Sequence, residues 1–135
     1  MLVDTSAWVT FVRQGAENAS DVLDQLLAEK RAAINEVIQA ELLIGAQDER
    51  HYKEFEVDLG TLPHLLLTAE AWNLVGELGF ALRRKGATIP LPDLTIAACA
   101  ISHQCELFSL DRHFDLIARH APLKIYRTAR AKNGR

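Results

Sequence analysis

Short apolar runs alternate along this chain with longer segments in which apolar residues recur every three or four positions. The short runs are typical of buried strands, and the longer periodic segments are typical of helices with one buried face. Strands that alternate with helices favour parallel pairing, with helices covering both faces of the sheet. The runs that predict strands lie at residues 1–3, 31–34, 64–67, 106–109 and 123–126.

Residues that favour helix ends stand between these runs. Thr5 or Ser6 is placed to cap a first helix, Asn35 a helix that follows the second run, and Thr68 a long helix that follows the third. Gly86 comes after the basic end of that long helix, where a glycine commonly terminates the helix. The capping residues therefore support the alternating strand–helix order.

The composition is that of one ordinary globular domain, with 135 residues, 49% hydrophobic and 24% charged. We expect a single domain over residues 1–126, followed by a basic and flexible tail at 127–135. The net charge is −3, yet residues 119–135 carry basic side chains and no acidic ones. This basic end is either a contact for a polyanion or a solvated terminus.

The chain has no apolar run long enough to span a membrane, and a strand beginning at Met1 leaves no room for a signal peptide. Cys99 and Cys105 lie in apolar surroundings, which predicts reduced core thiols and a cytoplasmic protein. No phosphate-binding glycine loop and no zinc-ligand spacing among the histidines is found, which argues against nucleotide-dependent and zinc enzymes.

Carboxylates recur at positions that a parallel sheet brings to one edge. Asp4 and Asp111 each follow a predicted strand, and Asp93 opens a helix that leads into a strand. Glu41 lies in the first half of a helix that follows a strand. Strand ends and helix beginnings share the carboxyl edge of such a sheet, where ligands bind. We therefore expect all four acids at that edge.

Several carboxylates in one pocket repel one another by about 4 kcal/mol per pair at roughly 4 Å, so a cation or protons must join them. Oxygen ligands favour Mg²⁺ or Mn²⁺, and such an ion supports phosphodiester cleavage by polarising the phosphate and activating water. Taken singly, each acid has a structural alternative: Asp93 as a helix-start residue, Asp111 as a turn residue, and Glu41 as a solvent-facing residue.

Four segments carry a resemblance to a known family: LVDTSAWV, AELLIGA, LPDLTIAACA and LFSLDRHF. In order and spacing they resemble the acidic motifs of PIN-domain nucleases, and most of all the VapC-type toxins of bacterial toxin–antitoxin pairs. The resemblance covers residues 1–126. It implies a three-layer α/β/α sandwich with a mainly parallel sheet of four to five strands. It also implies a Mg²⁺- or Mn²⁺-dependent endoribonuclease with an RNA substrate, a cognate antitoxin and a homodimeric state.

The resemblance assigns roles to the acids. Asp4 and Asp93 fall on the positions that usually hold metal, and Glu41 and Asp111 complete the metal shell directly or through water. Ser109 matches the hydroxyl residue that commonly precedes the last acid. Supporting roles are also expected for the two hydroxyl residues beside Asp4, Thr5 and Ser6.

The chain departs from the family pattern at His113, where many relatives carry a further acid. His113 is either an RNA-phosphate contact or water-orienting group, or an ordinary surface histidine. Three further candidate RNA contacts have a charge at the end of a helix as their alternative role; they are Arg83, Arg84 and Lys85. Arg112 is also a candidate RNA contact.

Other functions fit less well. A phospho-receiver domain needs a second acid after the first strand, where this chain has Thr5, and a haloacid-dehalogenase phosphatase needs one at Ser6. A catalytically silent binding subunit is disfavoured by the intact acids. A housekeeping RNA-processing PIN nuclease is the alternative if no antitoxin gene lies nearby.

Overall fold

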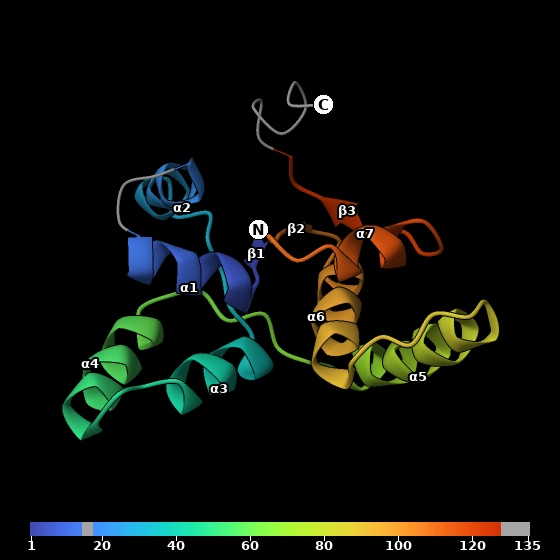
Figure 1. Cartoon of the computed structure of the whole chain (residues 1–135), viewed down its shortest axis with the longest axis horizontal. Coiled ribbons are helices and arrows are strands. Elements are labelled where there is room, and N and C mark those ends of the chain that lie inside the picture. Colours follow the sequence, from blue (N-terminus) through green and yellow to red (C-terminus); the bar gives the residue numbers. More distant parts are fainter. Residues whose placement is uncertain (15–17, 128–135) are drawn as a thin grey trace.

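A parallel sheet lies at the centre of the computed structural model, which describes residues 1–14 and 18–127 (Figure 1). Its regular strands follow the order β1-β2-β3 and all pair in parallel. Leu2 lies opposite Leu107, which in turn lies opposite Ile125. The strands are β1 (Leu2–Val3), β2 (Glu106–Phe108) and β3 (Lys124–Ile125).

The segments predicted as second and third strands extend the sheet only as isolated parallel bridges. Ala33 bridges to Leu2, and Ile34 bridges to His64. Neither segment runs on as a regular strand, because a helix begins directly after Ile34 and Pro63, which has no N–H to donate, precedes the other bridge. The predicted parallel sheet is therefore present, with three regular strands and two single-bridge extensions.

The helices begin at the predicted caps in most cases. The Asn35 side chain accepts a hydrogen bond from the Ile38 N–H at 2.9 Å, and that of Thr68 accepts from the Ala71 N–H at 3.2 Å. The helices are α1 (Thr5–Gln14), α2 (Asn18–Ala28), α3 (Glu36–Ile44), α4 (Glu49–Gly60), α5 (Ala69–Arg84), α6 (Leu91–Ser102) and α7 (His113–Ala118).

Helices flank the strands on both sides, with α1 to α4 gathered on one side and α5 to α7 on the other (Figure 1). Helix α6 is the most deeply buried of the described helices, because every residue from Leu94 to Ala100 is buried. Its small side chains let it pack closely on the sheet and on α5. This packing fixes the first turn of α6, which carries Asp93.

None of the described helices is both long and apolar enough to cross a bilayer. Cys99 is a free, fully buried thiol, and burial raises its pKa to about 11; Cys105 is free and partly buried. The basic tail predicted at 127–135 lies outside the described residues except for Arg127.

Gly86 ends α5 with a φ of +86°, a conformation that costs little only for glycine. A Cβ added there would meet no atom within 4 Å, so a substitution changes backbone energy alone. We expect Gly86→Ala to lower the free energy of unfolding by about 1 kcal/mol, measured by urea denaturation. The matched variant Gly60→Ala, in open space at the end of α4, should leave stability unchanged or slightly raised. Equal effects of the two variants would contradict this account.

Candidate active site

Asp4 is a buried carboxylate held by two hydroxyl groups at the carboxyl end of β1. Its backbone N–H donates to the Phe108 carbonyl at 2.9 Å, which joins it to β2, and the residue is only 4% exposed. Its Oδ2 accepts from Ser6 Oγ at 2.8 Å and from Ser109 Oγ at 2.9 Å. Its Oδ1 has no hydrogen-bond partner among the described residues. The two hydroxyls thus orient the carboxylate and leave one oxygen available for a ligand.

The hydroxyls of Thr5 and Ser6 serve the acids and do not cap α1, so the prediction that one of them caps this helix is wrong. The helix already begins at Thr5, and the Asp4 carboxylate accepts from the Ser6 N–H at 3.3 Å. Thr5 Oγ1 instead donates to Glu41 Oε1 at 2.7 Å. This hydrogen bond ties the half-buried Glu41 of α3 to the residue that follows Asp4.

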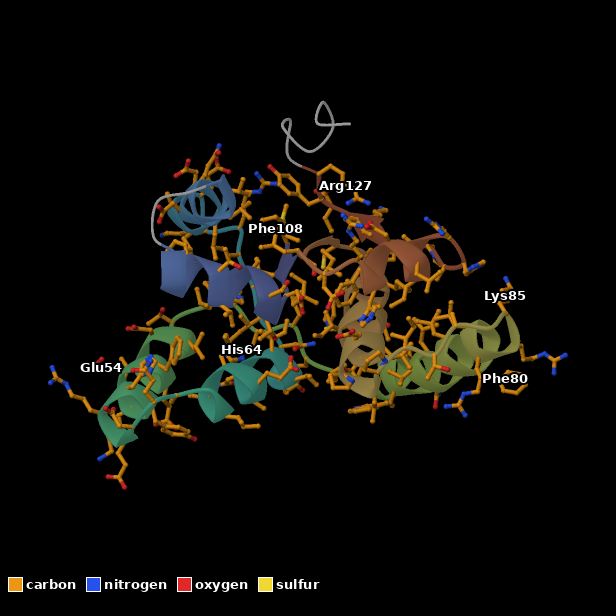
Figure 2. The ribbon with its side chains drawn as sticks, in the orientation of Figure 1. Glu54, His64, Phe80, Lys85, Phe108 and Arg127 are labelled. Atoms are coloured by element: carbon orange, nitrogen blue, oxygen red, sulfur yellow. The ribbon has the colours of Figure 1, made fainter. Side chains whose placement is uncertain are left out.

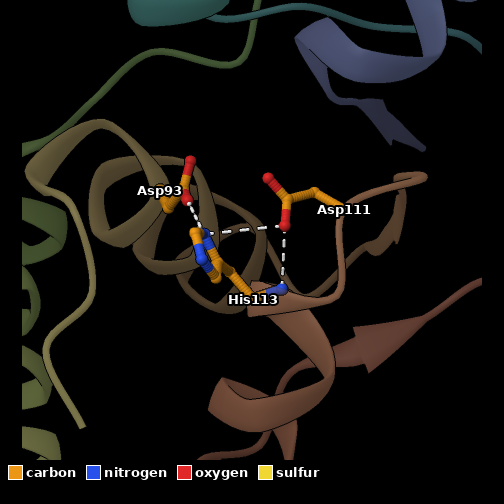
Figure 3. Close-up of side chains that lie close together, drawn as sticks. All are labelled: Asp93, Asp111 and His113. Carbon is orange, nitrogen blue, oxygen red and sulfur yellow. Dashed lines mark hydrogen bonds and ion pairs between the residues drawn. The ribbon is translucent and has the colours of Figure 1, made fainter.

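Asp93, Asp111 and His113 form a second cluster, from the first turn of α6, the loop after β2 and the start of α7 (Figure 3). Each offers one donor atom, and these atoms lie within 4.8 Å of one another. His113 Nδ1 lies 2.7 Å from Asp93 Oδ2 and 3.5 Å from Asp111 Oδ1. The His113 N–H also donates to Asp111 Oδ1 at 2.9 Å.

The two clusters are neighbours in space. Ser109 links them directly, because its Oγ donates to Asp4 and accepts from the Asp111 N–H at 3.0 Å. The charges also interact: burial raises the pKa of Asp93, and the Asp111 and Asp4 carboxylates raise it further, against the lowering effect of the His113 hydrogen bond. The structure thus gathers Asp4, Asp93 and Asp111 at the carboxyl edge, with Glu41 attached through Thr5.

His113 is the hydrogen-bonded partner of Asp93 in this acidic cluster. The hydrogen bond to Asp93 is the main cause that raises the pKa of the imidazole, and the Asp111 carboxylate adds to it. An imidazolium placed there offsets part of the repulsion among the carboxylates. Sequence reasoning placed His113 near the site but did not assign it to Asp93; its position two residues after Asp111 was the only available signal.

The donor set suits a hard divalent cation. Ligands at 2.0–2.1 Å from Mg²⁺ lie up to about 4 Å apart, close to the spacing of this cluster. Two of the three donor groups are carboxylates, and burial, followed by the nearby Asp111 and Asp4 carboxylates, raises the pKa of Asp93. Asp93 and Asp111 would hold such an ion, with the available oxygen of Asp4 beside them.

Other predicted contacts lie apart from the acids. Lys85 is at the outer end of α5 (Figure 2), where its Nζ lies 3.2 Å from His120 Nδ1. The Arg84 guanidinium stacks over Phe80 at 5.7 Å from the ring centroid. Arg83 lines a shallow hollow on α5 with Phe80. Arg112 differs from these three, because it lines a cavity shared with Ser109 and Asp111.

Comparisons with known proteins agree with this arrangement. A family model described as the PIN domain matches residues 1–120. Ribonuclease VapC11 of Mycobacterium tuberculosis is 36% identical over 123 residues, which cover 88% of this chain and 92% of that protein. The VapC ribonuclease Mb1587 of Mycobacterium bovis matches with the same identity and coverage. The chain belongs to the PIN-domain family, and these relatives place it among the VapC-type nucleases of that family.

Solved structures share the fold over nearly the whole chain. The crystal structure of VapBC2 from Rickettsia felis bound to a DNA fragment from its promoter gives a TM-score of 0.78 at 24% identity, covering 93% of this chain and 96% of that chain. VapBC-5 from Mycobacterium tuberculosis, a member of the VapBC family of toxin–antitoxin systems, gives 0.66 at 25% identity, covering 94% and 97%. The predicted PIN-like α/β architecture is therefore confirmed.

Binding of a divalent ion should stabilise the folded chain, because an unfolded chain does not assemble these ligands. An ion at about 100 times its Kd adds about 2.7 kcal/mol, and Tm should rise by several degrees. Asp93→Asn should keep or raise the Tm of the metal-free protein, since it removes repulsion, and should lose most of the metal-induced rise. The exposed control Asp24→Asn should behave as wild type. Differential scanning calorimetry with MgCl₂ or MnCl₂ measures both, and an undiminished rise in Asp93→Asn would contradict the assignment.

Proposed function

We propose that this chain is the toxin of a toxin–antitoxin pair and cleaves RNA with a divalent metal ion bound by its carboxylates. The observation that carries the proposal is the meeting of Asp4, Asp93 and Asp111 at one edge of the sheet, in a chain that belongs to the PIN-domain family. The relatives named above are ribonucleases. A housekeeping PIN nuclease is less favoured, because the similar solved structures are toxin–antitoxin complexes.

Each acidic side chain of the site, and each hydroxyl group that contacts one, has a proposed role. Asp93 and Asp111, with Asp4 beside them, would hold the ion, which when bound would polarise the scissile phosphate and lower the pKa of the attacking water. Ser6 and Ser109 fix the Asp4 carboxylate by donating to Oδ2, which leaves Oδ1 available for a ligand. Glu41, oriented by Thr5, is placed to accept a proton or to hold a water molecule at the edge of the cluster.

Mg²⁺ or Mn²⁺ is the ion that this donor set favours, because both prefer carboxylate and water oxygens to imidazole nitrogen. We therefore assign His113 to the support of Asp93 and not to the metal shell. In that role it would keep the Asp93 carboxylate in place while charge in the site changes. The His113 side chain is 48% exposed, so it is also accessible to an RNA phosphate.

The proposed partners are an RNA strand, a cognate antitoxin and a second copy of the chain. The second is supported by two similar solved structures, a toxin–antitoxin complex from Klebsiella pneumoniae and VapBC-5, a member of the VapBC family of toxin–antitoxin systems. Large apolar side chains are exposed on α5 and on the first turn of α6, as a protein interface needs; they are Trp72, Phe80 and Leu91. Sedimentation at micromolar concentration tests the dimer.

Asp4→Asn should abolish RNA cleavage while leaving the fold intact. The variant keeps the shape of the side chain but removes the charge that binds the ion, so we expect a loss of about 100-fold or more in kcat/KM. The assay is cleavage of single-stranded RNA with MgCl₂ or MnCl₂, with EDTA as a second arm. Asp24→Asn is the matched control for loss of one surface charge. Undiminished cleavage by Asp4→Asn, or in EDTA, would exclude the proposed mechanism.

Thr5→Val should lower kcat by about tenfold, because Glu41 loses the donor that orients it. Thr5→Ser keeps the hydroxyl and should retain near-normal kcat. KM should change little in either variant, since neither Thr5 nor Glu41 is assigned to substrate binding. The proposed role of Thr5 would be wrong if Thr5→Val and Thr5→Ser had the same kcat.

A further inference from the structure

A small cavity adjoins the carboxylate cluster on the side of β3. It has a volume of about 190 Å³, and its polar lining comes from Ser109, Asp111, Arg112, Asp115 and Arg127. Since a water molecule takes up roughly 30 Å³, the cavity has room for a phosphate group with water around it. Ser109 and Asp111 belong to both the cavity and the acidic cluster, so the two share a wall.

The charges that line the cavity are of two kinds. Asp111 and Asp115 contribute negative charge to the lining, and Arg112 and Arg127 contribute positive charge. Arg127 stands just beyond β3 (Figure 2), and its side chain is 47% exposed. Two arginines beside the acidic cluster complement an RNA strand that has one phosphate at the ion and a neighbouring phosphate in the cavity.

Among the residues that the structure describes, Asp115 is the partner of Arg127. One terminal nitrogen, Nη2, pairs with Asp115 Oδ1 in the first turn of α7. A guanidinium carries five N–H donors in a rigid fork, so Arg127 can hold this ion pair and donate to a phosphate as well. Asp115 is thereby an anchor that positions Arg127 over the cavity.

We propose that Arg127, with Arg112, forms a subsite for the RNA phosphate next to the one that is cleaved. The proposal rests on the ribonuclease function given above and adds a substrate-positioning residue to it. The subsite binds phosphate through charge and hydrogen bonds and reads no base. Arg127 therefore contributes to affinity for any RNA strand, and not to the chemical step.

The test compares Arg127→Ala with wild type in steady-state RNA cleavage at several salt concentrations. We expect KM to rise by about fivefold to tenfold with kcat nearly unchanged, as for a partly exposed charged hydrogen bond. The dependence of log KM on log salt should weaken by about 0.7, the value for one phosphate contact on a single strand. Arg127→Lys keeps the charge but not the fork, and should fall between the two.

Arg50→Ala is the matched control, because Arg50 also pairs with a carboxylate, Glu54, but lies on the exposed face of α4. It should leave KM and its salt dependence as in wild type. Unchanged KM and salt dependence in Arg127→Ala would overturn the subsite, as would an effect on antitoxin binding alone. If Arg127→Ala melted early and lost kcat instead, Arg127 would be a structural residue. Wild-type protein and Asp4→Asn are assayed in parallel. If wild-type protein does not cleave RNA, the ribonuclease function itself is wrong, and this outcome is distinct from failure of the subsite.

Discussion

Repulsion among carboxylates is the constraint on which this structure depends. Asp4, Asp93 and Asp111 lie close enough together that the charges of Asp111 and Asp4 add to the effect of burial in raising the pKa of Asp93. The fold holds them together because each is fixed to a rigid element: the end of β1, the first turn of α6 and the loop after β2. Burial of apolar side chains in the core, above all those of α6, stabilises the fold enough to hold the carboxylates together.

Neutral hydroxyl groups and one imidazole make the arrangement tolerable. Ser6 and Ser109 satisfy one oxygen of Asp4 without adding charge, and the His113 imidazole lies 2.7 Å from an oxygen of Asp93. The remaining carboxylate oxygens are suitable ligands for a divalent ion. Arg127 lies beyond this set, and its charge is neutralised in part by Asp115. Positive charge on Arg127 thus lies near the acidic cluster, where it can offset the repulsion between the carboxylates and a polyanionic strand.

Much of this could be predicted from the sequence, because short strands followed by capping residues define the topology and the topology defines the edge. The caps at Asn35 and Thr68 and the helix end at Gly86 follow from side-chain chemistry within a few residues. The reduction of two strands to single bridges has only partial signals in the sequence, the helix cap at Asn35 and Pro63, because its extent depends on how closely neighbouring segments approach in space. The contacts of Thr5 with Glu41 and of His113 with Asp93 depend likewise on tertiary packing between segments far apart in sequence.

The hydroxyl of Ser6 reaches from the beginning of the chain almost to its end, since it accepts from the Leu110 N–H at 3.0 Å and lies 3.2 Å from Ser109 Oγ. During translation, Asp4 is therefore synthesised long before Ser109, whose hydroxyl holds its carboxylate. A nascent chain that stops short of this segment lacks both the Ser109 hydroxyl that holds Asp4 and the Asp111 carboxylate. The site therefore cannot be complete before most of the chain has been synthesised.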